Sequence, residues 1–304
     1  MQGDGFNRWN DKSLEFIVCS NGISGTFVEH SMIDALTLTR LQTAIKDALE
    51  AHSPQPNGHT SSRAIVLHEF TCTTTPSVDE RIQQVRQRFL SDTANNEYVD
   101  IVHTAFGKSY LMSHGYPIKG TFDVMIQLAS FYLHEGHNPA SWEAVSMSHY
   151  HKGRPDIVQV VTPLVASFCA RANDEAIALR DRKTALLEAA RDHSDTIRKA
   201  GGGQAYVRTL WAMERAVREG EQAPGLFGDE LFQRTLEPAI MSSATDGLSP
   251  ESGFFLRDTR MFWMTYYVME EGAHVSLTGG HGRATRFGEC LRRAGETVRR
   301  LLDA

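Results

Sequence analysis

A histidine and an aspartate four residues apart form the first combination in this sequence that could do chemistry. His30 ends a predicted strand at residues 25–30, and Asp34 begins the helical pattern that follows. A carboxylate within reach of an imidazole fixes the tautomer and orientation of the ring, which is what a general base requires. Ordinary surface pairs have the same spacing, so two interpretations stay open: a catalytic base or a structural pair.

Positively charged side chains at two places could bind an anion. Arg208 lies inside an otherwise apolar helical stretch, residues 206–211. A buried or half-buried arginine needs an anionic partner, which would be a carboxylate of the protein or a carboxylate of a substrate. His149, His151 and Lys152 form a second basic group beside a Gly-Arg-Pro sequence. We interpret this second group as a solvated turn.

The common sequence motifs of hydrolases, nucleotide-binding proteins and zinc enzymes do not occur in the chain. It contains no G-x-S-x-G, no G-x-x-x-x-G-K-[ST], no H-E-x-x-H, and no G-x-G-x-x-G after a strand. The cysteines form no C-x-x-C pair, which indicates neither a disulfide framework nor a zinc site and favours a reducing compartment. They are Cys19, Cys72, Cys169 and Cys290. We expect no metal and no permanently bound cofactor.

The composition is that of a globular protein with a sizeable core. Of the 304 residues 41% are hydrophobic, and 31 Lys and Arg residues stand against 37 Asp and Glu residues, a net charge of −6. This balance argues against a protein that coats nucleic acid, which would carry a basic face. No apolar stretch reaches the roughly 18 residues that cross a bilayer, and the first residues lack the basic and apolar regions of a signal peptide. We expect a soluble, cytoplasmic protein.

Strands interspersed with helices must position the candidate residues. Alternating residues on both sides of a Ser-Asn-Gly turn predict a hairpin with strands at 14–19 and 25–30. The three glycines at 201–203 follow no strand, so they indicate a hinge between helices and not a phosphate-binding loop. The other predicted elements are strands at 64–70, 261–269 and 274–278 and helices at 34–52, 77–90, 120–135, 173–199, 205–219 and 285–302. This order indicates an α/β (α+β) protein with a mixed β-sheet flanked by helices.

A series of short fragments, colinear over nearly the whole chain, resembles the choline/carnitine O-acyltransferase family. Residues 7–18 are similar to the family's N-R-W-x-D-K-x-L-x-F-I-V, and residues 25–34 are similar to its G-x-x-x-E-H-A-x-x-[DE]. The other fragments are Phe-Gly-Lys at 106–108, Phe-Asp-Val at 122–124, Ser-Trp-Glu-Ala at 141–144, Gly-Arg-Pro at 153–155, Val-Arg-Thr-Leu at 207–210 and Met-Ser-Ser-Ala at 241–244. Their common order is what makes the resemblance specific.

The resemblance implies a fold and a division of the chain. Members of the family consist of two halves with similar folds, and each half resembles chloramphenicol acetyltransferase. Residues 1–304 then form one acyltransferase-like domain, in which 1–60 are a remnant of the half with the catalytic histidine and 61–304 are the second half. The acyltransferase domains attached to fungal polyketide synthases are the members that this divergent chain resembles.

The resemblance also implies catalytic roles. In the family the histidine of the E-H motif is the catalytic base and the acidic residue four positions later supports it, so these roles pass to His30 and Asp34. Ser242 and Ser243 stand in the L-S-T-S motif beside the reacting centre. Either serine would donate a hydrogen bond to the oxyanion of the tetrahedral intermediate.

Binding roles follow in the same way. Lys108 stands where the family has a lysine that contacts a phosphate of coenzyme A, and Asp123 and Lys119 accompany it at the pantetheine or nucleotide end. Arg208 stands where the family binds the carboxylate of carnitine, and Trp142 replaces a tyrosine of the same site. The co-substrate implied is a coenzyme A or phosphopantetheine thioester.

Departures from the family pattern change the expected substrates. Trp142 and Pro155 replace the tyrosine and threonine that help to hold the carnitine carboxylate, and two lost charge-assisted bonds cost several kcal/mol at about 1.5–3 kcal/mol each. Ala244 removes the last hydroxyl of the L-S-T-S motif. Met112 replaces a second lysine that contacts coenzyme A. Carnitine is therefore not the expected acceptor. A thioester on an acyl carrier protein lacks the 3′-phosphate of coenzyme A, so its binding would not need the second lysine.

These expectations combine into a predicted function with one alternative. The chain would move an acyl group between a thioester and the hydroxyl of a small alcohol, with a role in polyketide biosynthesis and secondary metabolism. Its partners would be a small alcohol as acceptor, acyl-CoA or an acyl carrier protein, and a polyketide synthase. Neither nucleic acid nor a membrane is expected. The alternative is a truncated, catalytically inactive family member that acts as a binding or partner subunit.

Overall fold

The computed structural model describes residues 8–9, 11–52, 71–217, 221–222, 224–245, 253–254, 256 and 258–304. The chain divides into two compact units, Met1–Ala94 and Asn95–Ala304, each of which is described by itself. The division predicted after residue 60 stays a prediction, while the contacts divide the chain just before the first strand of the large sheet begins. The predicted strand at 64–70 lies outside the described residues.

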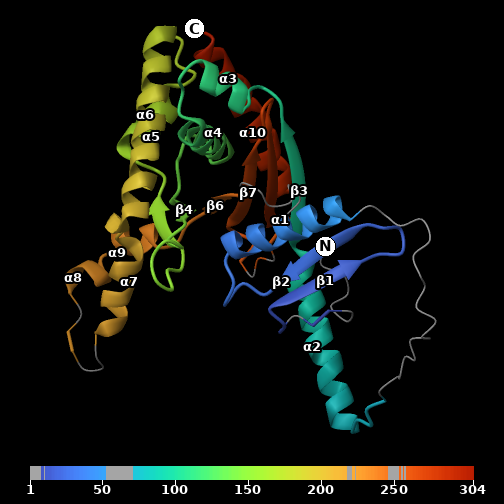
Figure 1. Ribbon diagram of the computed structural model, residues 1–304. Coiled ribbons are helices and arrows are strands. Elements are labelled where there is room, and N and C mark those ends of the chain that lie inside the picture. Colours follow the sequence, from blue (N-terminus) through green and yellow to red (C-terminus); the bar gives the residue numbers. More distant parts are fainter. Residues whose placement is uncertain are drawn as a thin grey trace. The chain divides into compact units, whose positions relative to one another are not determined.

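The first unit begins with the predicted hairpin, followed by two helices (Figure 1). Strand β1 (Leu14–Val18) pairs antiparallel with β2 (Ser24–Val28). Gly22 closes the turn at a φ of 85°, in the left-handed region that favours glycine. Helices α1 (Ala35–Ala51) and α2 (Pro76–Ala94) confirm the two helices predicted at 34–52 and 77–90.

Apolar side chains of the first unit are not buried. Among its described residues only Thr93 is buried, while Phe16 is 57% exposed and Leu49 is 70% exposed. A lone two-stranded hairpin is marginally stable in water unless it packs against other elements. The described part of this unit therefore contains no apolar core of its own.

The second unit is built on a six-stranded mixed sheet, which confirms the predicted sheet type. The strand order is β3-β8-β7-β6-β4-β5, with β4, β6 and β7 parallel and the other pairs antiparallel. The strands are β3 (Asn96–His103), β4 (Ser141–Val145), β5 (Asp156–Gln159), β6 (Ile240–Ala244), β7 (Phe262–Val268) and β8 (Ala273–Gly280). Only β7 and β8 were predicted. Strands β4, β5 and β6 have four or five residues, too few for a periodic pattern to identify.

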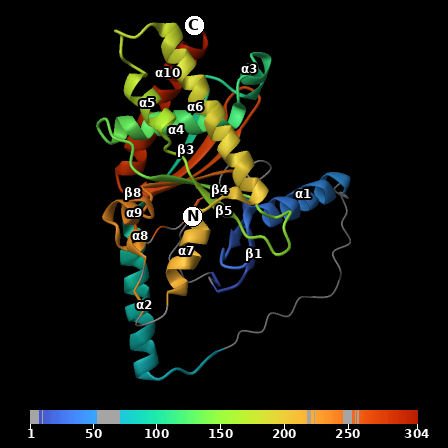
Figure 2. The same ribbon diagram turned by 90° about the vertical axis from the view of Figure 1, so that its left-hand side faces the viewer.

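Helices cover one face of this sheet (Figures 1 and 2). Alternation along β7 and β8 turns Met264, Tyr266 and Val275 towards the helices, in the main apolar core. Thr265 and Ser276 therefore lie on the opposite face. The helices of the core are α4 (Ile118–Leu133), α5 (Pro163–Arg171), α6 (Leu179–Lys199) and α10 (Arg283–Leu302).

The predicted hinge lies between two helices and takes a defined form. Helix α6 continues into one turn of π-helix, η1 (Ala200–Gln204), and Gly203 inside this turn has a left-handed φ of 83°. Helix α7 (Val207–Ala216) follows. The remaining helices are α3 (Lys108–Ser113), α8 (Gly225–Gly228) and α9 (Glu230–Thr235). Within the described ranges, every helix is too short or too polar to cross a membrane.

A histidine is buried where β3 meets α10. His103 is 5% exposed, and its ring packs against Phe106 and Phe122 with centroid distances of 4.7 and 5.6 Å. A Cβ atom on Gly295 would lie 2.3 Å from this ring, so the glycine permits the close approach. The Nε2 atom of His103 has no hydrogen-bond partner among the described residues. Burial lowers the pKa of His103 from 6.5 to about 4, because the charged ring would lose its hydration.

We expect this histidine to make the protein less stable in mild acid. Well above pH 6.5, His103 is neutral in both the folded and the unfolded chain. Below pH 6.5 the unfolded chain binds a proton on this histidine, whereas the folded chain binds it only near pH 4. The free energy of unfolding should fall by about 2 kcal/mol at pH 5 and about 3 kcal/mol at pH 4 from this group alone. Urea unfolding at pH 7 and pH 5 measures it. The loss should shrink in His103→Leu and persist in His151→Leu, an exposed histidine; an equal loss in both variants contradicts the prediction.

Candidate functional site

The first unit brings His30 and Asp34 together. The Nδ1 atom of His30 lies 3.7 Å from Oδ1 of Asp34, and their side chains are 44% and 19% exposed. His30 follows β2, and Asp34 is the N-cap residue of α1, where its side chain makes no capping hydrogen bond. The distance is longer than a hydrogen bond, as is common in catalytic pairs before substrate binds. The arrangement has the parts of a general base with a supporting carboxylate.

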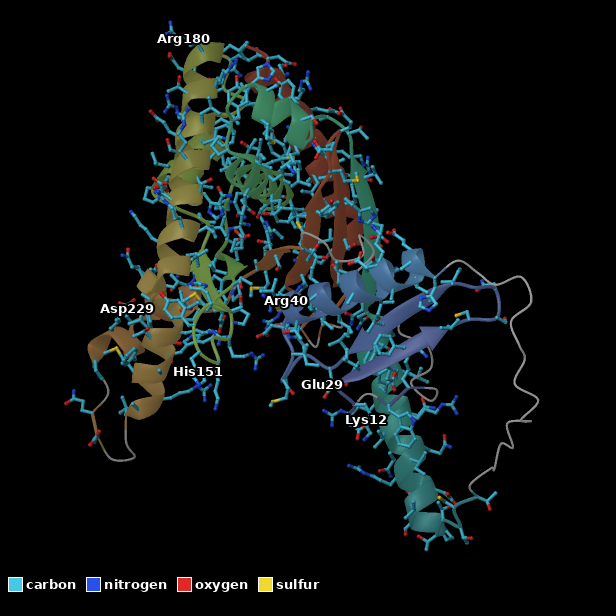
Figure 3. The ribbon with its side chains drawn as sticks, in the orientation of Figure 1. Lys12, Glu29, Arg40, His151, Arg180 and Asp229 are labelled. Carbon is cyan, nitrogen blue, oxygen red and sulfur yellow. The ribbon has the colours of Figure 1, made fainter. Side chains whose placement is uncertain are left out.

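The turn that carries His30 is held by its neighbours. The main-chain N–H of Ser31 donates to both oxygens of the Glu29 carboxylate, at 3.1 and 3.2 Å, and its hydroxyl donates to one of them. Glu29 lies just past the end of β2 in Figure 3. These bonds link the residues on the two sides of the histidine and hold the turn that carries it.

The two candidate serines point to opposite faces of the sheet. Ser242 is 1% exposed on the helix-covered face, and its hydroxyl donates to the main-chain oxygen of Trp142 at 3.3 Å. Ser243 lies on the other face, beside Thr265 in the register of β6 and β7. It is partly exposed. Because side chains alternate along a strand, only one of the two serines can face a substrate on either side.

The structure gives Trp142 and Arg208 positions that differ from expectation. Trp142 is 5% exposed, packs against Trp211, and donates its indole N–H to the main-chain oxygen of Thr235 at 3.1 Å. The protein itself therefore uses the only polar group of that side chain. Arg208 was expected to be buried or half-buried, but it is exposed on the first turn of α7. Val207 takes the buried position of this stretch.

The three residues expected to bind the thioester cofactor do not form one group. Lys108 begins α3, is 46% exposed, and lies 3.6 Å from the carboxylate of Glu270. Lys119 and Asp123 instead lie on α4, within a buried ionic cluster. Asp123 is 1% exposed, so we correct its assignment: its carboxylate binds protein groups and has no open side for a cofactor.

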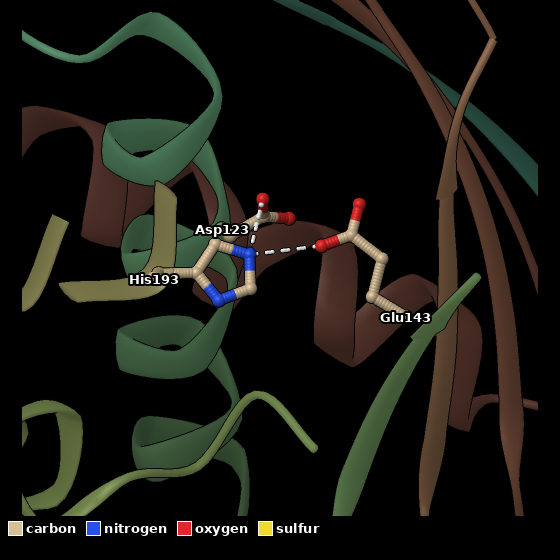
Figure 4. Close-up of side chains that lie close together, drawn as sticks. All are labelled: Asp123, Glu143 and His193. Carbon is tan, nitrogen blue, oxygen red and sulfur yellow. Dashed lines mark hydrogen bonds and ion pairs between the residues drawn. The ribbon is translucent and has the colours of Figure 1, made fainter. Parts of the chain in front are cut away.

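Two residues that no sequence pattern had indicated, His193 and Glu143, complete this cluster. His193 of α6 places Nε2 2.9 Å from a carboxylate oxygen of Asp123 and 2.9 Å from one of Glu143 on β4 (Figure 4). His193 and Glu143 are fully buried. Lys119 reaches in to both carboxylates, and Tyr266 donates its hydroxyl to Asp123 at 2.9 Å. The signal for His193 was its helical spacing from Leu186, Ala189 and Ala190, which share its buried face.

Neighbouring groups stabilise the charged form of Asp123. Burial by itself raises the pKa of Asp123, but the charges of Lys119 and His193, with hydrogen bonds from His193 and Tyr266, outweigh burial and hold the pKa below its ordinary value. The donor atoms of Asp123, Glu143 and His193 lie within 4.8 Å of one another, close enough to share a metal ion. The ammonium group of Lys119 contacts the same carboxylates. We interpret the cluster as an ion-pair network that joins α4, α6, β4 and β7.

Comparison with known sequences gives a consistent result over nearly the whole chain. The family model described as Choline/Carnitine o-acyltransferase matches residues 1–293. The highly reducing polyketide synthase ltbA of Aspergillus luteorubrus is 36% identical over an alignment of 315 positions, which covers 99% of this chain and 10% of the synthase. Mitochondrial carnitine O-acetyltransferase of Saccharomyces cerevisiae is 25% identical over 90% of this chain and 42% of its own. The chain thus spans about a tenth of the polyketide synthases it matches and less than half of this carnitine acyltransferase.

Comparison with solved structures gives weaker similarities. Polyketide synthase associated protein 5 from Mycobacterium tuberculosis has a TM-score of 0.45 and 14% identity, over 94% of this chain and 75% of its own. A chloramphenicol acetyltransferase has a TM-score of 0.36 and 11% identity, over 68% of this chain and 92% of its own.

Proposed function

The chain belongs to the choline/carnitine O-acyltransferase family, and from this premise we propose that it transfers an acyl group between a thioester and the hydroxyl of a small alcohol. The match over residues 1–293, together with the exposed His30 beside Asp34, carries the proposal. The similarity to polyketide synthases supports a place in polyketide biosynthesis. The donor is a thioester of coenzyme A or of a phosphopantetheine arm.

His30 supplies the proton transfer in this proposal. With Nδ1 turned towards Asp34, Nε2 takes the proton from the acceptor hydroxyl as its oxygen attacks the thioester carbonyl. The tetrahedral intermediate then collapses, the carbon–sulfur bond breaks, and the imidazolium returns the proton to the departing thiolate. In the reverse direction His30 deprotonates the thiol. Asp34 orients the ring and stabilises its charged form.

The oxyanion and the donor involve residues of the second unit. Ser242 already donates to a main-chain oxygen, so we assign the hydrogen bond to the oxyanion to Ser243. Lys108 is the residue assigned to a phosphate of the donor, since its ammonium group is exposed. The exposed Arg208 binds an anionic group of the acceptor. Trp142, whose N–H is already used, contributes no polar contact.

An assay of thiol release tests the proposal. Acetyl-CoA and an acetylated carrier domain are each mixed with carnitine, choline or glycerol, the free thiol is followed with a chromogenic disulfide, and the ester is identified by mass spectrometry. Release that depends on an alcohol, with choline or glycerol favoured over carnitine, supports the proposal. Thioester binding without acceptor-dependent release would overturn it.

The second candidate is a family member that binds a thioester or a partner protein without turnover. Two observations favour it: the indole N–H of Trp142 is bonded to the protein, and the described part of the first unit buries no apolar side chain. Binding without release in the same assay would support this candidate.

A further inference from the structure

The last helix of the chain carries an unusual excess of positive charge. Helix α10 contains six arginines and two glutamates, a net charge of +4, in a chain whose overall charge is −6. Its apolar residues face the core, so the charged residues occupy the outer face. Such a concentration of one sign produces a local field that can attract a partner of the opposite sign.

Three of these arginines form a stripe along the helix. Arg286, Arg293 and Arg300 recur at seven-residue intervals and are all exposed. At 1.5 Å per residue the stripe is roughly 21 Å long. Arg293 packs on the ring of Tyr132, with 4.1 Å from its guanidinium carbon to the ring centroid. No described carboxylate lies within ion-pair distance of Arg286 or Arg300, so their charges face solvent.

The stripe ends beside the helix that carries Lys108. Tyr110 of α3 donates its hydroxyl to Asp303 at 2.6 Å, and the guanidinium of Arg299 stacks on the same tyrosine at 3.9 Å. Arg299 also donates to the main-chain oxygen of Ala105 at 3.0 Å. The C-terminal end of α10 and α3 are therefore packed together. The residue assigned to the phosphate of the donor lies at the same end of the second unit as the stripe.

Apolar surface is available at this end as well. An open surface hollow of about 480 Å³ lies against the last turn of α10. Leu179, which is 37% exposed, lines it together with two arginines and two carboxylates: Arg299, Arg300, Glu296 and Asp303. Met112 of α3 is 59% exposed. Protein interfaces commonly combine such an apolar centre with a charged surround. At roughly 21 Å, the stripe is also longer than a group of phosphates needs.

We propose that the arginine stripe of α10 docks an acidic acyl carrier domain, which presents its phosphopantetheine thioester beside Lys108. The proposal rests on the proposed function and names the partner that brings the donor. The phosphodiester at the base of the arm is itself anionic, so it too is attracted to this end. Complementary charges of this kind raise the association rate and select the partner.

Charge reversal of the stripe tests the proposal. The double variant Arg286→Glu with Arg300→Glu leaves Arg293 on its tyrosine, and Arg191→Glu with Lys199→Glu on α6 is the matched control, since both residues are exposed. Fluorescence anisotropy with a labelled carrier domain from a fungal polyketide synthase measures binding without any need for turnover. The kcat/KM with the acetylated carrier domain and with acetyl-pantetheine is measured in parallel.

The stripe variant should bind the carrier domain at least about 10-fold more weakly and lose a similar factor in kcat/KM with the carrier-bound donor. Acetyl-pantetheine turnover and the control variant should be unchanged. Equal binding by wild type and stripe variant overturns the proposal, as does wild-type binding to duplex DNA or phosphatidylserine vesicles as tight as to the carrier domain. If no thioester is turned over, the proposed function fails, while the anisotropy result still decides the docking surface.

Discussion

Replacing His30 with alanine is expected to lower the rate of acyl transfer by roughly 10²–10⁴-fold, the usual contribution of a general base. Without the imidazole, the acceptor hydroxyl must lose its proton to water as it attacks the thioester. His30 is 44% exposed and outside the apolar core, so the substitution should leave the folded state intact. The rate of thiol release, measured with the donor and acceptor that the wild-type protein uses, gives the loss.

Two further variants show whether the loss belongs to the base. Asp34→Asn keeps the shape of the residue that faces Nδ1 but removes its charge, so it should lower kcat less than His30→Ala does. His151→Ala removes another exposed histidine and should leave the rate unchanged. A His30→Ala protein with wild-type kcat would show that the pair is structural.

Replacing Glu143 with leucine is expected to lower the free energy of unfolding by about 3–5 kcal/mol, the cost of removing one partner from a buried ion pair. Glu143 is fully buried between Lys119 and His193. Its loss leaves the carboxylate of Asp123 alone to face both Lys119 and His193. Urea unfolding at pH 7 measures the change, and Glu188→Leu, an exposed position on α6, should shift it by less than about 0.5 kcal/mol.

A double-mutant cycle separates the ionic contact from loss of packing. Combining Glu143→Leu with His193→Leu removes both partners, so the double variant should be more stable than the sum of the single losses predicts. A coupling of at least about 1 kcal/mol fits a direct contact at 2.9 Å. If the losses of the two single variants simply add, the contact between Glu143 and His193 contributes only packing to the stability.

Local patterns in the sequence predicted the elements whose signals lie within a few residues. The hairpin follows from its alternating residues and the Asn-Gly turn, and the structure confirms it as β1 and β2. The four-residue spacing also predicted that His30 and Asp34 lie near each other, since four residues span one short turn. Helices α1, α4 and α10 were predicted from their apolar residues, and helices α2, α6 and α7 were predicted as well, with ends that differ by up to six residues.

Contacts between distant segments decided the rest. The sequence could not choose between Ser242 and Ser243, because the face each one occupies depends on how β6 pairs with β4 and β7. It placed Asp123 at a cofactor, whereas Glu143 and His193, 20 and 70 positions further along, enclose its carboxylate. The short strands β4, β5 and β6 likewise become strands only by pairing within the sheet.

The sequence by itself therefore determined the family, the mixed α/β class and the pairing of a histidine with an aspartate. Order along the chain and periodicity over a few residues are enough for those. The tertiary structure alone decided which polar side chains are enclosed and which face solvent. Burial depends on segments that meet only after folding. A charged side chain that these segments enclose pairs with groups of the protein and is not available to bind a ligand.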